Sequence, residues 1–488
     1  MKTIASTALP AHVQQPRYDR EQLRSRIVHF GFGAFHRAHQ ALLTNRVLNA
    51  KGGDWGICEI SLFSGDVLMG QLRAQDHLFT VLEKGAEGNQ PIIIGAVKEC
   101  LNAKLDSLAA IIEKFCEPQV AIVSLTITEK GYCIDPATGK LDMRNSRILH
   151  DLEHPSEPHS APGILVEALH RRRERGLPAF TVLSCDNIPD NGHVVKNAVL
   201  GMAGKRSAEL AAWIEAHVSF PGTMVDRIVP AATDASLAEI TQELGVEDPC
   251  AISCEPFIQW VVEDNFVAGR PEWEVAGVQM VEDVLPWEQM KLRMLNGSHS
   301  FLAYLGYLAG YAHINECMQD DSFREAARRL MLNEQAPTLR ITNVDLTAYA
   351  DSLLDRFANP ALQHRTWQIA MDGSQKLPQR MLEGIRMHLE RNTAWPLLAL
   401  GVAGWMRYVS GTDEQGNAID VRDPLSDKFQ AIVATSSDAE RVSALLTLNE
   451  IFGDDLPQNP VFVEAITSAY QRLVRLGARQ AVIATLKL

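Results

Sequence analysis

The sequence lacks long apolar runs, paired cysteines and any excess of basic residues, and each absence excludes a class of protein. No run of about eighteen apolar residues occurs, so no membrane-spanning helix is expected. The eight cysteines are scattered and none forms a C-x-x-C pair, which argues against a zinc ribbon or a disulfide scaffold. Acidic residues outnumber basic ones, 60 to 46, and the net charge of −14 argues against nucleic-acid and anionic-membrane partners.

The first residues also lack the apolar core of a signal peptide. Together with the unpaired cysteines, this predicts a reducing, cytoplasmic setting. The 488 residues, of which 46% are hydrophobic and 22% charged, are typical of a globular protein with two or three domains.

The N-terminal half alternates between short apolar runs typical of buried strands and segments with helical periodicity. The predicted strands are Arg26–Phe30, Trp55–Leu62, Gln119–Ile127 and Phe180–Cys185, with a hairpin over Leu78–Glu83 and Pro91–Val97. This alternation predicts a doubly wound, mostly parallel sheet, whereas helical periodicity dominates after about Val284. We therefore expect a Rossmann-like NAD-binding α/β domain over residues 1–284. A mainly α-helical domain over 285–488 would bind substrate and carry catalysis, with a cleft between the two.

A glycine-rich turn follows the first predicted strand. Gly31 and Gly33 would permit a tight turn and a close approach of the backbone to a pyrophosphate. The third glycine of the usual G-x-G-x-x-G pattern is replaced by His36, so the motif alone is a weak dinucleotide signal. Arg37 could pair with a phosphate. The spacing of His36 and His39 could suit a metal ion, although no carboxylate is arranged with them.

An acid just past the second predicted strand would bind the ribose hydroxyls of NAD in such a fold. Asp66 occupies that region and could equally be a turn residue, whereas Glu59 lies in the middle of the strand and is a poorer candidate. Because a carboxylate repels a 2′-phosphate, Asp66 predicts NAD rather than NADP.

The segment Trp287–Leu308 has helical periodicity and gathers polar side chains on one face. At about 100° per residue, Glu288 lies about 60° from Lys291, His299 about 80° and Asn296 about 140°. A buried lysine loses its proton more easily and can act as a base, and a nearby asparagine can stabilise a negative oxygen. Alternatively, Lys291 is a surface residue reaching solvent and Asn296 marks a simple helix end.

The pattern Lys-x4-Asn-x2-His resembles the active-site helix of the polyol-specific long-chain dehydrogenases, the mannitol dehydrogenase family. Six ordered blocks extend the similarity over essentially the whole chain: Gly31–His39, Thr128–Tyr132, Ser184–Asn187, Val225–Ile228, Lys291–His299 and Ile369–Pro378. Within the family, the chain is most similar to the fructuronate reductase branch. The resemblance implies metal-independent hydride transfer with a nicotinamide cofactor, in which D-fructuronate and NADH give D-mannonate and NAD.

The same resemblance assigns roles to residues of the helix and of the N-terminal half. Lys291 is the general acid/base, and Asn187 and Asn296 form an oxyanion hole. His299 orients the substrate or the lysine, and Glu288 helps pass the proton to solvent. The expected cofactor-binding residues are Phe30, Gly31, Phe32, Gly33, Ala34, Phe35, His36, Arg37, Asp66 and Asp226, and the expected substrate-binding residues are Lys376, Gln368, Arg293, His364 and Arg365.

One position departs from the family pattern and bears on the substrate. Mannitol dehydrogenases carry an arginine just before the Ile-Ala-x-Asp-Gly-Ser block, where this chain has Gln368, which puts mannitol in doubt. His364, Arg365, Lys376 and Arg380 could pair with a substrate carboxylate or with acidic side chains of the protein itself.

Three alternatives remain open. A dehydrogenase of a neutral polyol such as mannitol or arabinitol belongs to the same class. A catalytically silent dinucleotide-binding sensor belongs to another, but the intact set of Lys291, Asn296 and His299 weighs against it. A lyase or isomerase is more remote. The family resemblance also favours a monomer or a weak oligomer that acts on small molecules.

Overall fold

The computed structural model describes residues 3–62, 64–85, 87–135, 138–362 and 364–488. The chain divides into two compact units, Met1–Leu285 and Pro286–Leu488, and each has a packed core of its own. They are called the N-terminal unit and the C-terminal unit below, and each is described by itself.

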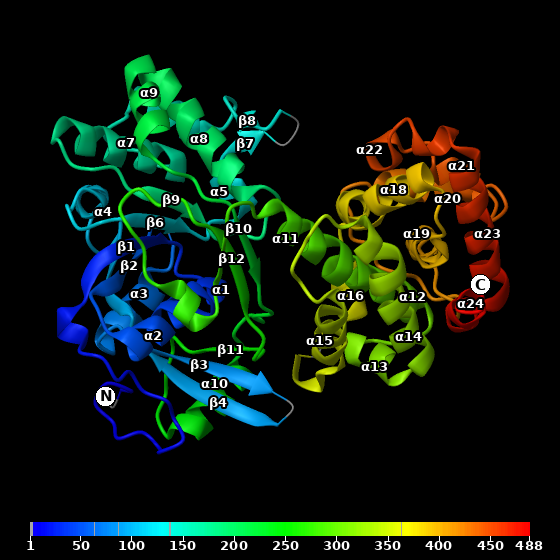
Figure 1. Ribbon diagram of the computed structural model, residues 1–488, viewed down its shortest axis with the longest axis horizontal. Coiled ribbons are helices and arrows are strands. Elements are labelled where there is room, and N and C mark those ends of the chain that lie inside the picture. The colour runs from blue at the N-terminus through cyan, green and yellow to red at the C-terminus, as the bar shows by residue number, and fades with distance from the viewer. Residues whose placement is uncertain (1–2, 63, 86, 136–137, 363) are drawn as a thin grey trace. The chain divides into compact units, whose positions relative to one another are not determined.

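A five-stranded parallel sheet forms the centre of the N-terminal unit (Figure 1). Its strands, in spatial order, are β5 (Val97–Asn102), β2 (Trp55–Ser61), β1 (Arg24–Phe30), β6 (Ile122–Leu125) and β9 (Thr181–Ser184). The chain runs outward from β1 on one side and then returns to place β6 and β9 on the other. The carboxyl ends of β1 and β6 therefore lie where the strand order reverses, which is the ligand-binding edge of open α/β sheets.

Helices cover both faces of this sheet, because neighbouring residues of each strand face opposite sides. Ile27 of β1 packs into a core with α2 (Gln40–Lys51), and the next residue, Val28, packs into a separate core with α7 (Ala161–Glu174). Strands buried on both faces read as continuous apolar runs, as the sequence does here. The predicted Rossmann-like, doubly wound domain is confirmed.

The remaining elements of the N-terminal unit extend this framework. The predicted hairpin is present as β3 (Phe79–Gly85) and β4 (Gly88–Ile94), paired antiparallel. The other strands are β7 (Ile134–Asp135), β8 (Lys140–Leu141), β10 (Thr223–Asp226), β11 (Ile252–Cys254), β12 (Gln259–Glu263) and β13 (Gln279–Val281). The other helices are η1 (Arg20–Gln22), α1 (Ala34–Ala38), α3 (Asp66–Ala74), α4 (Leu108–Phe115), α5 (Thr128–Gly131), α6 (Ser146–Glu153), α8 (Asn191–Arg206), α9 (Ala208–His217), α10 (Asp234–Leu244) and η2 (Trp273–Ala276).

The C-terminal unit is mainly helical, as predicted, and α19 (Pro396–Tyr408) runs through the middle of its helices (Figure 1). Gly404 of α19 lies against Leu305 of α12 (Ser298–Leu308), where a Cβ would be only 2.9 Å from the leucine side chain. The polypeptide enters through α11 (Leu285–Met290). The remaining elements are η3 (Lys291–Gly297), α13 (Ile314–Gln319), α14 (Asp321–Arg329), η4 (Leu330–Gln335), η5 (Ala336–Thr338), α15 (Leu346–Ala358), η6 (Pro360–Leu362), α16 (Thr366–Ala370), α17 (Gly373–Leu377), η7 (Pro378–Leu382), α18 (Glu383–Arg391), α20 (Ser426–Thr435), α21 (Arg441–Leu445), α22 (Asn449–Phe452), η8 (Leu456–Gln458), α23 (Pro460–Leu476) and α24 (Ala478–Thr485).

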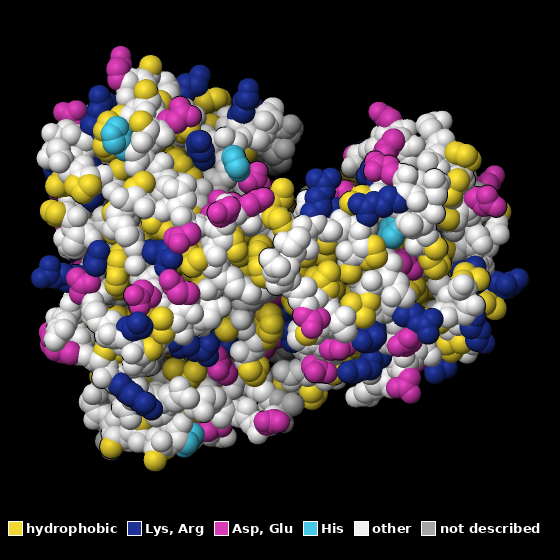
Figure 2. Space-filling view, viewed as in Figure 1, with side chains coloured by type: hydrophobic (Ala, Val, Ile, Leu, Met, Phe, Trp, Pro, Cys, Tyr) yellow, Lys and Arg dark blue, Asp and Glu magenta, His cyan; other side chains and the backbone are white. Residues whose placement is uncertain are grey.

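Surface and cysteine chemistry are unremarkable in both units. Acidic and basic side chains alternate over the visible face of each unit (Figure 2). All eight cysteines are buried and none is in a disulfide. Among the described residues, no helix has the length and apolar content needed to cross a bilayer.

Candidate active site

The glycine-rich turn leaves β1 at the edge where the strand order reverses. Gly31 has φ +108°, a left-handed value that a side chain disfavours, and a Cβ there would collide with the carbonyl oxygen of Thr126 at the end of β6. Its amide donates to the carbonyl of Ile60 in β2 at 2.9 Å. The turn is thus held against three strands at once, and bare backbone is exposed where a dinucleotide phosphate would approach.

Side chains beneath the turn fix its peptide groups. His29 Nε2 lies 3.0 Å from the carbonyl oxygen of Gly31, and the Thr126 hydroxyl donates to the same oxygen at 2.9 Å. The other ring nitrogen of His29 lies 2.7 Å from Ser124 Oγ. The Thr126 hydroxyl and the neighbouring His29 ring hold the peptide that follows Gly31 in a single orientation, because a peptide group is planar.

Two residues predicted to bind the cofactor are instead engaged inside the unit. Arg37 is buried, and its guanidinium donates to the carbonyl oxygens of Gly33 at 3.2 Å and Cys250 at 2.6 Å, so the predicted phosphate contact is wrong for this conformation. His36 is buried against Glu59, with 2.7 Å between Nε2 and Oε1. Both side chains thus bind partners elsewhere in the sequence, Cys250 for Arg37 and Glu59 for His36.

The other residues of the turn that were predicted to bind the cofactor lie from the end of β1 to the start of α1. Phe30 ends β1, Phe32 packs edge-on against Phe79, and Ala34 and Phe35 begin α1, where Phe35 stacks on His39. His39 lies 3.0 Å from the carbonyl of Gln259 through Nε2, so it is not paired with His36 in a metal site.

His29, His36 and Glu59 form a buried cluster whose nitrogen and oxygen atoms all lie within 4.8 Å of one another. The two imidazole rings are stacked, with centroids 3.3 Å apart and planes at 8°. Stacked rings direct their lone pairs in parallel planes, which is poor geometry for convergence on one metal ion. Both rings are neutral, because burial lowers the pKa of His36 to about 3 and that of His29 well below its ordinary value, and burial raises the pKa of Glu59 to about 7.

A pH dependence of stability follows from Glu59. Its folded-state pKa of about 7 exceeds the ordinary 4.5, so between these values the folded protein keeps a proton that the unfolded chain releases. Stability from this group is therefore present at low pH and lost as pH rises toward 7. Between pH 5 and pH 8 the parent should lose free energy of unfolding that Glu59→Gln keeps. The difference between variant and parent should therefore shift in favour of the variant by on the order of 1–3 kcal/mol. Denaturant unfolding at both pH values measures this, and a pH-independent difference would contradict it.

Asp66 and Asp226 lie at the positions that the sequence predicted for cofactor acids, and their roles stay predictions. Asp66 is the first residue of α3, just after β2, and its carboxylate accepts from Lys104 Nζ at 2.9 Å. That bond lowers the pKa of Asp66, so the residue is ionised at neutral pH. Asp226 is buried at the end of β10. The next residue, Arg227, donates to the carbonyls of Ala38 and Glu255 and so ties this strand to the first helices.

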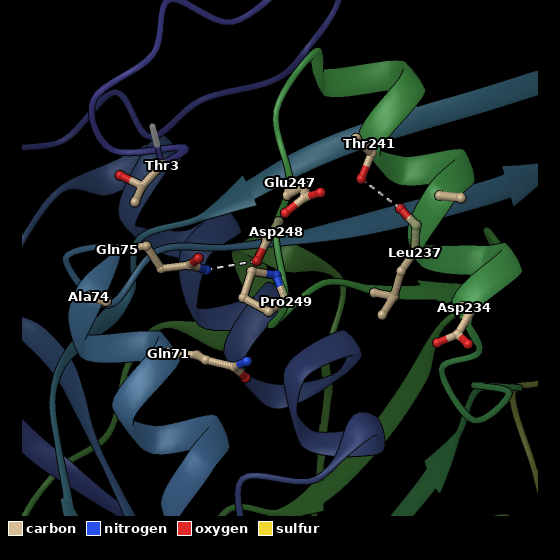
Figure 3. Close-up of a pocket in the computed structure, with 11 residues that line it drawn as sticks. Thr3, Gln71, Ala74, Gln75, Asp234, Leu237, Thr241, Glu247, Asp248 and Pro249 are labelled. Carbon is tan, nitrogen blue, oxygen red and sulfur yellow. Dashed lines mark hydrogen bonds between the residues drawn. The ribbon is translucent and has the colours of Figure 1, made fainter. Parts of the chain in front are cut away.

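The N-terminal unit also contains a cavity of about 510 Å³ between α3 and α10 (Figure 3). Figure 3 shows Asp248 at its wall, where Gln75 Nε2 donates to the carboxylate at 2.7 Å. Its lining is Thr3, Gln71, Ala74, Gln75, Asp234, Leu237, Ala238, Thr241, Glu247, Asp248 and Pro249. None of the predicted cofactor residues is among these described lining residues, so the cavity is not assigned to the cofactor.

Asn187 lies in an exposed loop after β9, on the same sheet edge as the glycine-rich turn. The preceding residue, Asp186, accepts hydrogen bonds from the amides of Ile127 and Thr128, both at 3.0 Å, and from the hydroxyl of Tyr132 at 2.5 Å. The buried carboxylate thereby locks together the loops that follow β6 and β9. Asp186 lies in one of the blocks of family similarity, Ser184–Asn187, but the sequence assigned it no role, because its contacts join two loops that are distant in the chain.

In the C-terminal unit, the prediction of regular 100° steps from Lys291 to His299 is wrong. The helix is continuous from α11 into α12, but η3, Lys291–Gly297, is a π-helix. Its hydrogen bonds close five residues on rather than four, so residues five apart, such as Lys291 and Asn296, move toward one side. Such segments occur often at functional sites.

The π-helix is wedged between two further π segments, η4 and η7. A Cβ at Gly297 would lie 2.7 Å from Gln335 Nε2 and 2.9 Å from the carbonyl of Arg380. Gln335 donates to that same carbonyl at 3.0 Å. Gly297 is thus required by close packing rather than by a helix end, and the alternative of a simple helix end at Asn296 is excluded.

Lys291 and His299 are both buried, with 6% and 7% of their surfaces exposed, and Glu288 and Asn296 are half-buried. Lys291 is therefore not among the exposed residues of the described chain. The His299 ring stacks on Phe357 at 4.7 Å and meets His364 edge-on at 4.9 Å. Burial, helped by the neighbouring charges, holds the pKa of His299 well below its ordinary value, so the ring is neutral and can donate or accept one hydrogen bond.

The predicted substrate residues divide into two groups. Arg293 is buried, and its guanidinium donates to the carbonyl and hydroxyl of Thr338 at 2.7 and 3.0 Å, so the prediction that it binds substrate is wrong. Lys376 donates to the carbonyls of Ile369 and Met371, and burial lowers its pKa to about 8. His364 lies against His299, whereas Arg365 and Gln368 are exposed around the start of α16.

Comparisons with known proteins place this geometry in a family. The family model described as the mannitol dehydrogenase Rossmann domain matches residues 25–275, and that of the mannitol dehydrogenase C-terminal domain matches residues 283–474. Uncharacterized oxidoreductase YeiQ of Escherichia coli (strain K12) is 80% identical over 488 residues, all of both chains. D-mannonate oxidoreductase of the same organism is 59% identical over 487 residues, 99% of this chain and 100% of that protein.

Among solved structures, Pseudomonas fluorescens mannitol 2-dehydrogenase, in a ternary complex with NAD and D-mannitol, matches with a TM-score of 0.83. It is 42% identical, and the match covers 98% of each chain. The two family models cover most of each unit, and the helix that carries Lys291 lies within the second matched region. The chain belongs to the mannitol dehydrogenase family of oxidoreductases.

Proposed function

We propose that this chain is an NAD(H)-dependent secondary-alcohol dehydrogenase that reduces a keto-uronate, D-fructuronate, to the aldonate D-mannonate. The observation that carries the proposal is the placement of Lys291 and His299, both buried, with Asn296 on one π-distorted helix. The 59% identity to a D-mannonate oxidoreductase supports the substrate class, and the relative solved with NAD supports the cofactor.

The residues of the N-terminal unit suit a dinucleotide. The Gly31 turn has no room for a side chain and presents backbone at the ligand-binding edge, and Asp66 offers an ionised carboxylate after β2 for the ribose hydroxyls. When bound, the nicotinamide supplies the hydride. Asp226, at the end of β10, would lie by its ribose.

The reaction requires the chain to supply a proton donor and hydrogen-bond donors for the reacting oxygen. As the carbonyl carbon is reduced, its oxygen gains negative charge and then a proton. Lys291 delivers that proton, and the amides of Asn187 and Asn296 donate hydrogen bonds to the oxygen. His299 is neutral and orients the substrate or the lysine, and the half-buried Glu288 returns a proton from solvent to Lys291. No metal ion is needed in this scheme, since the lysine and two amides supply acid and polarisation.

The experiment that tests the function is NADH oxidation by the purified protein with a panel of ketoses and keto-uronates. The keto-uronate reductase predicts turnover with D-fructuronate above all others. A neutral polyol dehydrogenase would reduce fructose comparably, and a silent sensor would oxidise NADH with none of them.

The cofactor preference should depend on Asp66. Asp66→Ala removes the ribose acceptor and frees Lys104, whose ammonium would then attract a 2′-phosphate. We expect the preference for NADH over NADPH, measured as a ratio of kcat/KM, to fall by about 10-fold or more, the equivalent of about 1.4 kcal/mol. If the parent enzyme prefers NADPH, or the variant keeps the preference, Asp66 is a turn residue only.

A further inference from the structure

Arg380 lies in η7 and carries a guanidinium whose charge is not matched inside the unit. Nη1 donates to Ser300 Oγ at 3.0 Å and to the carbonyl of Asn296 at 3.4 Å, whereas Nε is shielded from solvent and has no hydrogen-bond partner. Across the described ranges of the chain, no carboxylate comes within ion-pair distance of it. Enclosing a cation without an anion is costly, so such a group points to an anion supplied from outside.

The contrast with Arg293 shows what a purely structural arginine looks like in the same region. Arg293 lies in η3, the π-helix that carries Lys291, and is also buried, but Thr338 accepts from one end of its guanidinium and the Glu383 carboxylate lies 3.6 Å from the other. Burial lowers the pKa of both arginines, to about 10 for Arg380. Only Arg293 has a carboxylate of the protein beside it.

The surroundings of Arg380 are positive as well. Arg380, Arg356 and Lys376 all lower the pKa of His299, whereas the carboxylates of Asp372 and Asp423 act on Lys376. His364, in contact with His299, has a shielded Nδ1 without a partner. The potential around His299 therefore favours a negative ligand group.

We propose that Arg380 is the specificity-determining residue that binds the carboxylate of the keto-uronate. The proposal rests on the proposed function and names the residue that selects its substrate class. Arg380 touches the backbone of Asn296 and the side chain of Ser300, the residue after His299, so it flanks the residues assigned to the reacting ketone. In D-fructuronate, three carbons separate ketone and carboxylate, a span that an arginine beside these residues can bridge.

The test compares kcat/KM for D-fructuronate and D-fructose in the parent, Arg380→Gln and Arg380→Lys. We expect Arg380→Gln to lose at least about 10²-fold on fructuronate, mostly through KM, as when one partner of a buried charge pair is truncated. Fructose should change by no more than about threefold, and NADH binding should be unchanged. Arg380→Lys keeps the charge but not the bidentate fork, so its loss on fructuronate should be intermediate.

Arg293→Gln is the matched control, because Arg293 is a buried arginine of η3 that has partners of its own within the unit. We expect it to lower the melting temperature while leaving the ratio of the two substrates as in the parent. Equal losses on both substrates in the Arg380 variants would overturn the proposal, because Arg380 would then merely hold Asn296 in place. If Arg380→Gln does not fold, the Lys variant decides in the same way. A parent enzyme that prefers fructose would instead refute the proposed function itself.

Discussion

Lys291→Ala should lower turnover by at least about 10²-fold, the usual contribution of a positioned general acid/base. Lys291 is buried on the π-helix, so no other amine of this helix can take its place, and water is a poor proton donor at neutral pH. The glycine-rich turn belongs to the N-terminal unit, so the affinity for NADH should stay close to that of the parent. Steady-state kinetics and NADH titration separate these two effects.

The control for this variant is an exposed lysine of the same unit. Lys428→Ala removes an ion pair with Glu450 at the surface, and it should leave turnover within about twofold of the parent. Near-normal turnover in Lys291→Ala would contradict the assignment of Lys291 as the general acid/base.

D-fructuronate should exceed D-fructose in kcat/KM by about 10³-fold or more. A site built around a charged partner rejects an analogue that lacks it, because the protein's own polar groups are left unpaired, and such sites reach about 10⁴–10⁵. Here the unpaired groups would be Arg380 and the shielded nitrogen of His364. The departure at Gln368 from the arginine of mannitol-type enzymes points the same way.

The two ketones must be compared at the same pH, near or below 8. Burial lowers the pKa of Lys376 to about 8, so above that value one positive charge near the site is lost and an anionic substrate should bind less well. Comparable efficiency on the two ketones at lower pH would move the assignment to a neutral polyol dehydrogenase.

The fold could be predicted from the sequence because its signals are local. The β-branched run around Ile122–Leu125 and the alternation of strands with helices indicated a buried parallel sheet, and the structure contains it. Strand ends were predicted to within about three residues: Trp55–Leu62 is observed as Trp55–Ser61, whereas Gln119–Ile127 is observed as the shorter Ile122–Leu125.

The site could be predicted only in part, because side-chain partners depend on residues far away. Arg37 and Arg293 look like anion binders in sequence, but the carbonyls of Cys250 and Thr338, reached only after folding, satisfy them. Glu59 was set aside as a mid-strand residue, yet it is the partner of His36. The π-helix depends on packing between η3, η4 and η7, which no periodicity reveals.

Hydride transfer from NADH to the ketone is tested most directly with NADH that carries deuterium at the transferable position of its nicotinamide. With D-fructuronate as substrate, we expect D-mannonate with deuterium on the carbon that had been the ketone, formed in step with NADH consumption and without added metal. Failure to consume NADH with D-fructuronate, or an aldonate product without deuterium, would contradict the account.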